Sequence, residues 1–371
     1  MTWLDAGPFL RGVAWRDEDG FPLRANPADL DRLPWDVLER ARVPVGVTLE
    51  FLAYETEDGT ESGTKTGTQA GTKTGTQAGT KTGTQAGTKS RTQAVEIRFR
   101  AEPGEVPHAF GLWAGGEQLT EVLADPVPGE TTVTVPLPPG RGPFTVHPPE
   151  TQSPRLLGIR ALGGRIAPAP PRPRWVVHGD SITEGWWSTR PAHAWPAAAG
   201  RLLGLEPVNL GHAGAGRAEL AVAQQIAALP ADVLTLAFGT NCWGRAPFDV
   251  PLLRATMRSF LALVRRGHPD TPLLVVSPVL RPAAEDAPNT AGATLGALRT
   301  ALEDVVREEA AAGDGRLALL PGLGLLGPDR LADGLHPDDA GHALIAAAVA
   351  EALTKLLADA GLPTHGSRRA G

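Results

Sequence analysis

The fold is decided by Trp175-Val-Val-His-Gly-Asp-Ser-Ile-Thr-Glu-Gly185, an apolar strand that leads into a Gly-Asp-Ser turn and then into a helix start. Such a junction places the hydroxyl of Ser181 at the carboxyl edge of a sheet, beside the unpaired N–H groups of a helix N-terminus, where negative charge is favoured. That geometry suits a nucleophile whose attack creates an oxyanion. Asp and Ser are also the commonest turn and cap residues, so the stretch alone leaves a structural helix cap as the alternative for Ser181.

The part of the chain that follows alternates apolar runs with amphipathic segments. Strands are expected at residues 175–178, 207–210, 233–238, 273–277 and 317–320, and helices near 194–203, 218–229, 250–266, 291–312 and 338–360. Five βα units in a row imply a mainly parallel sheet with helices on both faces. In such sheets the ligand crevice lies outside the carboxyl ends of the strands, so the loops at those ends carry the functional information.

The first half of the chain has a β-rich pattern. Residues 46–54 and 94–100 alternate apolar with polar side chains, which predicts two half-buried strands that are neighbours in one sheet. Shorter strands are expected at residues 109–113, 119–123, 131–137, 144–147 and 156–161. Many short strands with frequent turns are typical of a β-sandwich, which we expect over residues 1–165. Within this range, residues 27–42 are expected to form a short helix or a docked arm.

A proline-rich segment separates the two halves. Four prolines among residues 168–173 predict a stiff linker at residues 166–174, so the second domain is expected to cover residues 175–361. Residues 362–371 are expected to be a disordered tail.

An insertion of low complexity interrupts the β-rich half at residues 60–93. Four copies of an eight-residue unit follow one another there; the first is Gly63-Thr-Lys-Thr-Gly-Thr-Gln-Ala70, and the last, residues 87–94, is degenerate. The unit holds no large apolar side chain, so it cannot bury enough surface to offset the cost of ordering the chain. We therefore expect a flexible insertion in a β-hairpin. The alternative, a Ca²⁺-binding β-roll, needs carboxylates that the unit lacks.

Length, net charge and cysteine content limit the kinds of molecule that this protein is expected to bind. The 371 residues are enough for two domains, and the formal net charge of −6 offers no basic surface for nucleic acid or an anionic membrane. Cys242 is the only cysteine, which excludes an internal disulfide and a cysteine-based zinc site. The first residues lack the basic and apolar regions of a signal peptide, and no window reaches about 18 consecutive apolar residues. We expect a cytoplasmic protein with a small-molecule partner and neither a nucleic-acid nor a membrane partner; the oligomeric state stays open.

Three further loops carry side chains and backbone groups that can take part in catalysis. They read Asn209-Leu-Gly-His-Ala-Gly-Ala-Gly216, Phe238-Gly-Thr-Asn-Cys-Trp-Gly244 and Asp333-Gly-Leu-His-Pro337. A nucleophilic serine needs a base to remove its proton, a carboxylate to orient that base and preorganised donors for the oxyanion. His336 is the candidate base, and Asp333, which precedes it in the same loop, is the candidate orienting carboxylate.

The four blocks occur in one order over residues 175–341, and together they resemble the SGNH (GDSL-type) serine hydrolases. The resemblance implies a flavodoxin-like three-layer αβα domain with no metal and no cofactor. It also implies a catalytic triad of Ser181, Asp333 and His336. The oxyanion donors implied by the resemblance are the backbone N–H groups of Ser181 and Gly214 and the side chain of Asn241.

Two positions leave alternatives open. Gly211 competes with Gly214 for the oxyanion role in the second block. In the third block the family commonly has Gly-x-Asn-Asp, whereas this chain has Gly239-Thr-Asn-Cys242, so any support that the second Asp gives to the loop is absent. Cys242 itself would be the nucleophile of a Cys-His enzyme, although a free cysteine is most often a small buried hydrophobe.

A β-rich half followed by a hydrolase half is similar to the two-domain carbohydrate acetyl esterases of the same superfamily, with a jelly-roll-like β-sandwich in front. The predicted function is a serine esterase that hydrolyses short-chain acyl esters, acetyl above all, of carbohydrates through an acyl-enzyme. The alternatives are a lipase or thioesterase of the same superfamily and a non-catalytic carbohydrate-binding protein. Four side chains on the crevice loops are expected to contact the substrate: Trp186, Trp187, His212 and Trp243. For the tryptophans, packing of the core between helix and loop is an equal alternative.

Excising residues 63–86, which are three full repeats, is expected to change the melting temperature and ester turnover little. The closure entropy of a flexible loop grows slowly, by about 0.6 kcal/mol per doubling of its length, so the shorter loop should add slight stability. Thermal unfolding and an ester hydrolysis assay on the excised and full chains test this. A large loss in either would show that the repeats are ordered or line the site.

Overall fold

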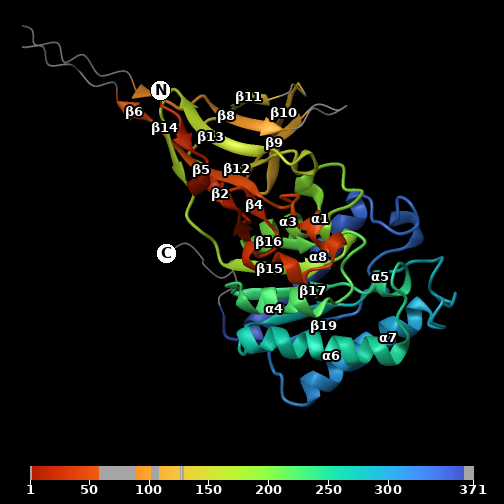
Figure 1. Cartoon of the computed structure of the whole chain (residues 1–371). Helices are drawn as coiled ribbons and strands as arrows, with labels where there is room; N and C mark the ends of the chain where they lie inside the picture. The colour runs from red at the N-terminus through yellow and green to blue at the C-terminus, as the bar shows by residue number, and fades with distance from the viewer. Residues whose placement is uncertain (1, 58–88, 102–107, 126, 128, 363–371) are drawn as a thin grey trace, which may run out of the picture.

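The computed structural model describes residues 2–57, 89–101, 108–125, 127 and 129–362 (Figure 1). The insertion expected at residues 60–93 lies outside the described residues except for 89–93, and the tail expected at 362–371 lies outside them except for Leu362. Figure 1 shows strands gathered at one end of the molecule and a sheet covered by helices at the other. The β-rich and α/β patterns of the sequence therefore correspond to two different ends of the structure.

The second half of the chain builds one parallel sheet. Its strands, in spatial order, are β16 (Glu206–Gly211), β15 (Arg174–Gly179), β17 (Val233–Ala237), β18 (Leu273–Val276) and β19 (Leu317–Leu320). Each lies where the sequence predicts a strand. The chain order reverses beside β15, and such a reversal opens a ligand crevice at the carboxyl ends of the strands. The mixed α/β class and its parallel sheet are thus confirmed.

Helices cover both faces of this sheet. One face is covered by α3 (Trp195–Leu203) and α8 (Asp339–Asp359), and the other by α4 (Leu220–Ala228), α6 (Val250–Gly267) and α7 (Leu295–Ala311). Val176 and Val177 of β15 point into the two opposite cores, so the strand is buried on both sides, as its continuous apolar run indicates. The shorter elements of this half are α2 (Ser181–Glu184), η4 (Pro191–His193), α5 (Thr240–Trp243) and η5 (Pro328–Arg330).

Helix α8 is long and apolar enough, by length and composition alone, to cross a membrane. Half of its apolar window is nevertheless buried inside the fold, where Ile345, Val349 and Leu353 belong to the core between α8, α3 and the sheet. A core helix passes the same test, so α8 is weak evidence for a membrane span.

The first half forms two antiparallel sheets (Figure 1). One contains, in order, β1 (Leu4–Asp5), β13 (Arg155–Leu162), β8 (Ala94–Ala101) and β11 (Gly129–Pro136). The other contains β10 (Glu117–Ala124), β9 (His108–Ala114), β12 (Phe144–His147), β5 (Thr48–Tyr54) and β14 (Arg165–Pro168), with β2 (Leu10–Arg11) also paired to β5. Their buried side chains share one core, in which the ring centroids of Phe99 and Phe110 lie 4.9 Å apart.

The prediction that residues 46–54 and 94–100 are neighbours in one sheet is wrong. They form β5 and β8, which lie in different sheets and meet only through the side chains of the shared core. Period-2 alternation shows that one face of a strand is buried, but it does not identify the strand to which the backbone is hydrogen-bonded. The short strand β6 (Thr56–Glu57) pairs with β7 (Lys89–Ser90), which lies near the end of the range expected for the insertion.

The linker is shorter than residues 166–174. Residues 166–168 belong to β14, which pairs with β5 at the edge of its sheet. Pro168 is compatible with this place. Proline has no backbone N–H, and the open side of an edge strand does not need one for sheet pairing. The proline run therefore contributes an edge strand before it becomes a connector to β15.

Part of the N-terminal segment packs on the α/β half, although its sequence precedes the β-rich half. Its first helical element, η1 (Gly7–Phe9), packs through Phe9 in the core of the two antiparallel sheets. The hairpin β3 (Trp15–Arg16) and β4 (Pro22–Leu23), then η2 (Pro27–Arg32) and α1 (Trp35–Ala41), follow it. Ala25, Val37 and Ala41 are buried in the same core as Val208 and Val222. Residues 24–43, which we call the docked arm, contain the short helix or arm expected at residues 27–42, and they lie outside the β-sandwich expected over residues 1–165.

Glu150 lies where the two halves meet. It begins η3 (Glu150–Gln152), is 6% exposed and accepts a hydrogen bond from the Gly46 N–H at 2.6 Å. Burial raises the pKa of this carboxyl to about 7, although the Gly46 N–H and the charge of Arg24 oppose the rise. The folded protein therefore binds a proton at Glu150 over a pH range in which the unfolded chain does not.

The substitution Glu150→Gln is expected to stabilise the protein at pH 8 and to have little effect at pH 4. A folded-state pKa raised to about 7 means that the free energy of unfolding falls as pH rises from about 4.5 to 7. Gln keeps an acceptor for the Gly46 N–H and removes the charge, so the gain at pH 8 should be on the order of 1–3 kcal/mol. Urea unfolding at the two pH values measures it, with the exposed Glu18→Gln as control. Equal stability of wild type and Glu150→Gln at pH 8 would contradict the prediction.

Candidate active site

The turn after β15 brings the predicted nucleophile, base and carboxylate together. Asp180 caps α2 by accepting a hydrogen bond from the Ile182 N–H at 3.0 Å, which leaves Ser181 at the first helical position, 5% exposed. His336 Nε2 lies 2.9 Å from Ser181 Oγ, and His336 Nδ1 lies 2.7 Å from Asp333 Oδ2. Both distances are those of hydrogen bonds, so the three side chains form one continuous chain of contacts.

The backbone of loop 333–337 helps to hold the His336 ring, in addition to the side-chain contact with Asp333. Asp333 Oδ1 accepts hydrogen bonds from the backbone N–H groups of Leu335 at 3.0 Å and His336 at 2.7 Å. Partial burial favours a higher pKa for Asp333, but these bonds and the imidazole more than offset it, so the pKa lies below its ordinary value. An ionised Asp333 can orient the ring and stabilise a positive charge on it.

The expected oxyanion donors lie on three neighbouring elements. Ser181 is at the N-terminus of α2, Gly214 follows β16 with a φ of 70°, and Asn241 is in α5. The Asn241 side chain donates to the Gly216 carbonyl at 3.4 Å, which links α5 to the loop after β16. Within the described part of the chain, the N–H groups of Ser181 and Gly214 donate no hydrogen bond.

The geometry favours Gly214 over its competitor Gly211. The Gly211 N–H already donates to Asn209 Oδ1 at 2.8 Å. A Cβ at Gly211 would lie 2.3 Å from the backbone N of Glu184, so glycine is required there for close packing against α2. Gly211 thus has a packing role that explains its presence in the block.

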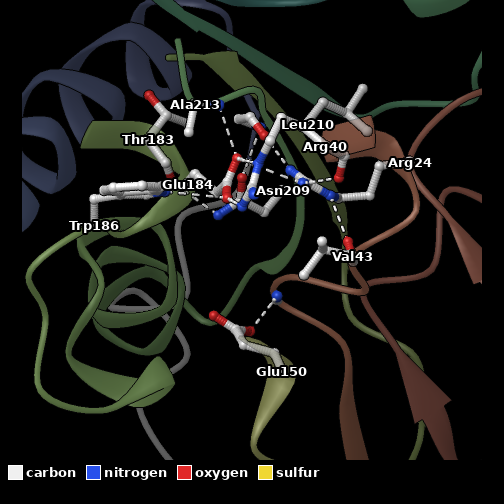
Figure 2. A network of polar contacts seen from close by, with 12 residues as sticks. Arg24, Arg40, Val43, Glu150, Thr183, Glu184, Trp186, Asn209, Leu210 and Ala213 are labelled. Atoms are coloured by element: carbon white, nitrogen blue, oxygen red, sulfur yellow. Dashed lines mark hydrogen bonds and ion pairs between the residues drawn. The ribbon is translucent and has the colours of Figure 1, made fainter. Parts of the chain in front are cut away.

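A buried ion network that the sequence did not reveal lies directly behind these loops (Figure 2). Glu184, the last residue of α2, is 4% exposed and pairs with Arg24 at 3.5 Å and with Arg40. The same carboxylate accepts hydrogen bonds from the Ala213 N–H at 2.8 Å and from Trp186 Nε1 at 3.3 Å. Both arginines belong to the docked arm, so α2, the loop after β16 and the arm meet at one carboxylate.

Two of the expected substrate-binding tryptophans, Trp186 and Trp187, line one cavity, and Trp186 also lies beside the histidine. The Trp186 ring centroid is 5.6 Å from that of His336, and Trp186 is 44% exposed. Trp187 is 55% exposed and has a φ of 66°, which is uncommon for a bulky residue and is often found at functional sites. Both line a cavity of about 500 Å³ whose other walls include Val45 and Glu150 of the first half. The cavity is therefore formed by both halves of the chain.

The structure does not place His212 on the crevice. Its side chain is 1% exposed, and its ring packs against His178 with centroids 5.6 Å apart. Burial lowers the pKa of His212 well below its usual range. The expectation that His212 contacts substrate is thus corrected, because the loop turns its side chain into the core.

The other two residues of the third block also have packing roles. Trp243 is half-buried, donates from Nε1 to the Ala287 carbonyl at 2.8 Å and lies under the guanidinium of Arg281. Cys242 is fully buried in the core, and burial raises the pKa of its thiol. A thiol in this state is a poor nucleophile, which disfavours the Cys-His alternative. No group of three His, Cys, Asp or Glu among the described residues is arranged to hold a metal ion.

Solved structures of similar shape span nearly the whole chain. A salicylyl-acyltransferase, SsfX3, from a tetracycline biosynthetic pathway has a TM-score of 0.74 at 23% identity, over 96% of this chain and 97% of its own. A protein from Bacteroides ovatus ATCC 8483 assigned as a GDSL-like lipase has a TM-score of 0.71 at 19% identity, over 96% and 98%. A family two carbohydrate esterase from Cellvibrio japonicus has a TM-score of 0.59 at 14% identity, also over 96% and 98%. At these identities the likeness shows a shared fold.

Comparison with curated protein sequences gives no match. The model of one protein family, the GDSL-like lipase/acylhydrolase family, matches residues 177–344. That range contains the turn of Ser181, the loops of Gly214 and Asn241, and the pair Asp333 and His336. The α/β half of this chain therefore contains a GDSL-like lipase/acylhydrolase domain.

Proposed function

We propose that this protein is a serine ester hydrolase that works through an acyl-enzyme intermediate. Ser181 is the nucleophile, His336 the general base and Asp333 the group that orients it. The observation that carries the proposal is the 2.9 Å contact between His336 Nε2 and Ser181 Oγ, together with the 2.7 Å contact from His336 Nδ1 to Asp333. A purely structural helix cap would need neither contact.

The reaction follows from these positions. His336 Nε2 takes the proton of Ser181 Oγ as that oxygen attacks the ester carbonyl carbon, and Asp333 stabilises the resulting imidazolium. The oxyanion accepts hydrogen bonds from the N–H groups of Ser181 and Gly214 and from Asn241. Collapse of the intermediate breaks the bond to the alcohol, which leaves with the proton held by His336. Water then attacks the acyl-enzyme in the same way and releases the acid and Ser181.

We propose that the substrate is a short-chain acyl ester, an acetyl ester above all, of a carbohydrate. The carbohydrate esterase among the similar structures supports this class of substrate, and so do two exposed indoles, Trp186 and Trp187, on which a sugar ring can stack. The cavity of about 500 Å³ beside them is within the size range of small-molecule sites. The alcohol part of the ester would occupy this cavity, with Trp186 between it and His336.

An acyltransferase would differ only in the second step, where an acceptor alcohol replaces water. The similarity to a salicylyl-acyltransferase favours this as the second candidate function. The products decide between the two: free acid indicates hydrolysis, and a new ester in the presence of an acceptor alcohol indicates transfer. A lipase or thioesterase stays the alternative for the substrate class.

We further propose that the two N-terminal sheets are a jelly-roll-like β-sandwich that helps to shape the cavity. Their shared core supports the sandwich, and the place of Val45 and Glu150 in the cavity wall supports the role. The cytoplasmic location stays a prediction.

The substitution Ser181→Ala is expected to lower kcat by about 10⁵–10⁶-fold, whereas Asp333→Ala leaves a measurable remnant after a loss of about 10⁴-fold. The reason is that a poorly oriented histidine still acts as a base, whereas no group replaces the nucleophile. Kinetics on p-nitrophenyl acetate measure both, with Ser259→Ala, an exposed serine on α6, as control. Mass spectrometry after treatment with a fluorophosphonate should find the adduct on Ser181. Inactivation by an adduct on Cys242 alone would overturn the assignment.

Short acyl chains are expected to react faster than long ones. An apolar cavity of about 720 Å³ does exist, but its walls include Leu205, Val233 and Pro272 at the amino ends of the strands, on the opposite edge of the sheet from Ser181. Each CH₂ bound in an apolar pocket would raise kcat/KM by up to about fourfold. Comparing p-nitrophenyl acetate, butyrate and octanoate is the test. A steady climb from acetate to octanoate would move the assignment to a lipase or thioesterase.

A further inference from the structure

We propose that Glu184, held by Arg24 and Arg40 of the docked arm, is a positioning residue for the loop that carries the Gly214 oxyanion donor. The inference rests on the proposed function, because it gives Gly214 that role. Glu184 ends the helix that Ser181 begins, so one short helix has the nucleophile at one end and this carboxylate at the other. The carboxylate accepts the Ala213 N–H at 2.8 Å, and Ala213 directly precedes Gly214.

The arginines make a buried carboxylate possible at this place. Burial alone would raise the pKa of Glu184, but the charges of Arg24 and Arg40 and the Ala213 N–H more than reverse that rise. Glu184 is therefore ionised, and a hydrogen bond from an N–H group to a charged acceptor is stronger than one to a neutral acceptor. Removing one partner of such a buried pair leaves an uncompensated charge.

Arg24 is itself fixed by backbone carbonyls, two of them in the arm (Figure 2). Arg24 Nε donates to the Val43 carbonyl at 2.7 Å, and Arg24 Nη2 donates to the Arg40 carbonyl. Arg24 Nη1 donates to the Gly211 carbonyl, so the same side chain also reaches the start of the loop. The loop is thus tied to the arm at Gly211 and, through Glu184, at Ala213.

A second set of bonds joins the start of the loop to α2. Asn209 Nδ2 donates to the Thr183 carbonyl at 2.8 Å, and Asn209 Oδ1 accepts the Gly211 N–H at 2.8 Å. The Glu184 carboxylate holds the peptide between His212 and Ala213 through its N–H, directly before the peptide between Ala213 and Gly214 that carries the oxyanion donor. Because an oxyanion donor must lie at about 2.7–3.1 Å from the developing charge, a small shift of that peptide weakens catalysis.

A second contact, made by Glu206, serves as a control. It distinguishes positioning of the Gly214 loop from simple attachment of the N-terminal segment. Glu206, at the amino end of β16, accepts the Gly12 N–H at 3.0 Å and lies 3.9 Å from Arg11. Like the Glu184 network, Glu206 connects β16 to the N-terminal segment. It does so at the end of β16 that is remote from the crevice. If the network only attached the segment, loss of either carboxylate would have the same consequence.

The test compares Glu184→Gln, Arg40→Ala and Arg40→Lys with the control Glu206→Gln. On p-nitrophenyl acetate, Glu184→Gln and Arg40→Ala should lose 10- to 100-fold in kcat per titrated active site with little change in KM. Arg40→Lys should recover most of the rate, because it restores the charge. Glu206→Gln should keep kcat even where its melting temperature falls. Arg40 has a side chain that is 28% exposed, so its variants remain informative if Glu184→Gln does not fold.

Hydrogen exchange gives a readout that does not depend on ester turnover. Peptides covering residues 211–216 should exchange faster in Glu184→Gln and Arg40→Ala than in wild type and in Glu206→Gln. Unchanged exchange there, or equal kcat in Glu184→Gln and Glu206→Gln, would overturn the positioning role. A wild-type protein that hydrolyses no ester would instead overturn the proposed function, while the exchange data would still decide whether Glu184 orders the loop.

Discussion

Close backbone packing around the turn after β15 is the constraint on which the candidate site depends. A Cβ at Gly179 would lie 2.3 Å from the Ala237 carbonyl of the neighbouring strand, and a Cβ at Gly216 would lie 2.5 Å from the Gly179 carbonyl. Because these positions lack side chains, the turn can sit against β17 on one side and the loop after β16 on the other. Ser181 and the Gly214 loop are close for that reason, before any side-chain contact is made.

Electrostatics then ties this turn to a distant part of the chain. The docked arm precedes the β-rich half in sequence, yet it fills the core beneath β16 and supplies both arginines of the buried network. The chain therefore leaves the α/β half after residue 43, builds the remaining strands of the two sheets and returns at Arg174. The α/β half is completed by residues more than a hundred positions upstream, so its packing requires the docked arm.

The features that could be predicted from the sequence are those that leave a local pattern in it. The strands of the parallel sheet have continuous apolar runs, and the side chains that follow them must meet at one edge, so Ser181, Asp333 and His336 could be named in advance. The sheet partner of β5 could not, because alternation records burial and not pairing. Arg24 and Glu184 are 160 residues apart and have no periodic signal that links them. The burial of His212 could not be predicted either, because a loop position does not tell whether a ring points outward or, as here, into the core.

Three buried carboxyl groups near the crevice show why the arginine pair matters at only one of them. Burial raises the pKa of Asp180 and of Glu150 to about 7 each, since backbone N–H groups offset only part of the desolvation. Glu184 is comparably buried, but two guanidinium groups hold its pKa below the ordinary value. Near neutral pH the first two can exchange protons with solvent, whereas Glu184 keeps its charge. Glu184 must stay ionised to hold one backbone N–H in place across the working pH range. The arginines of the docked arm keep it ionised.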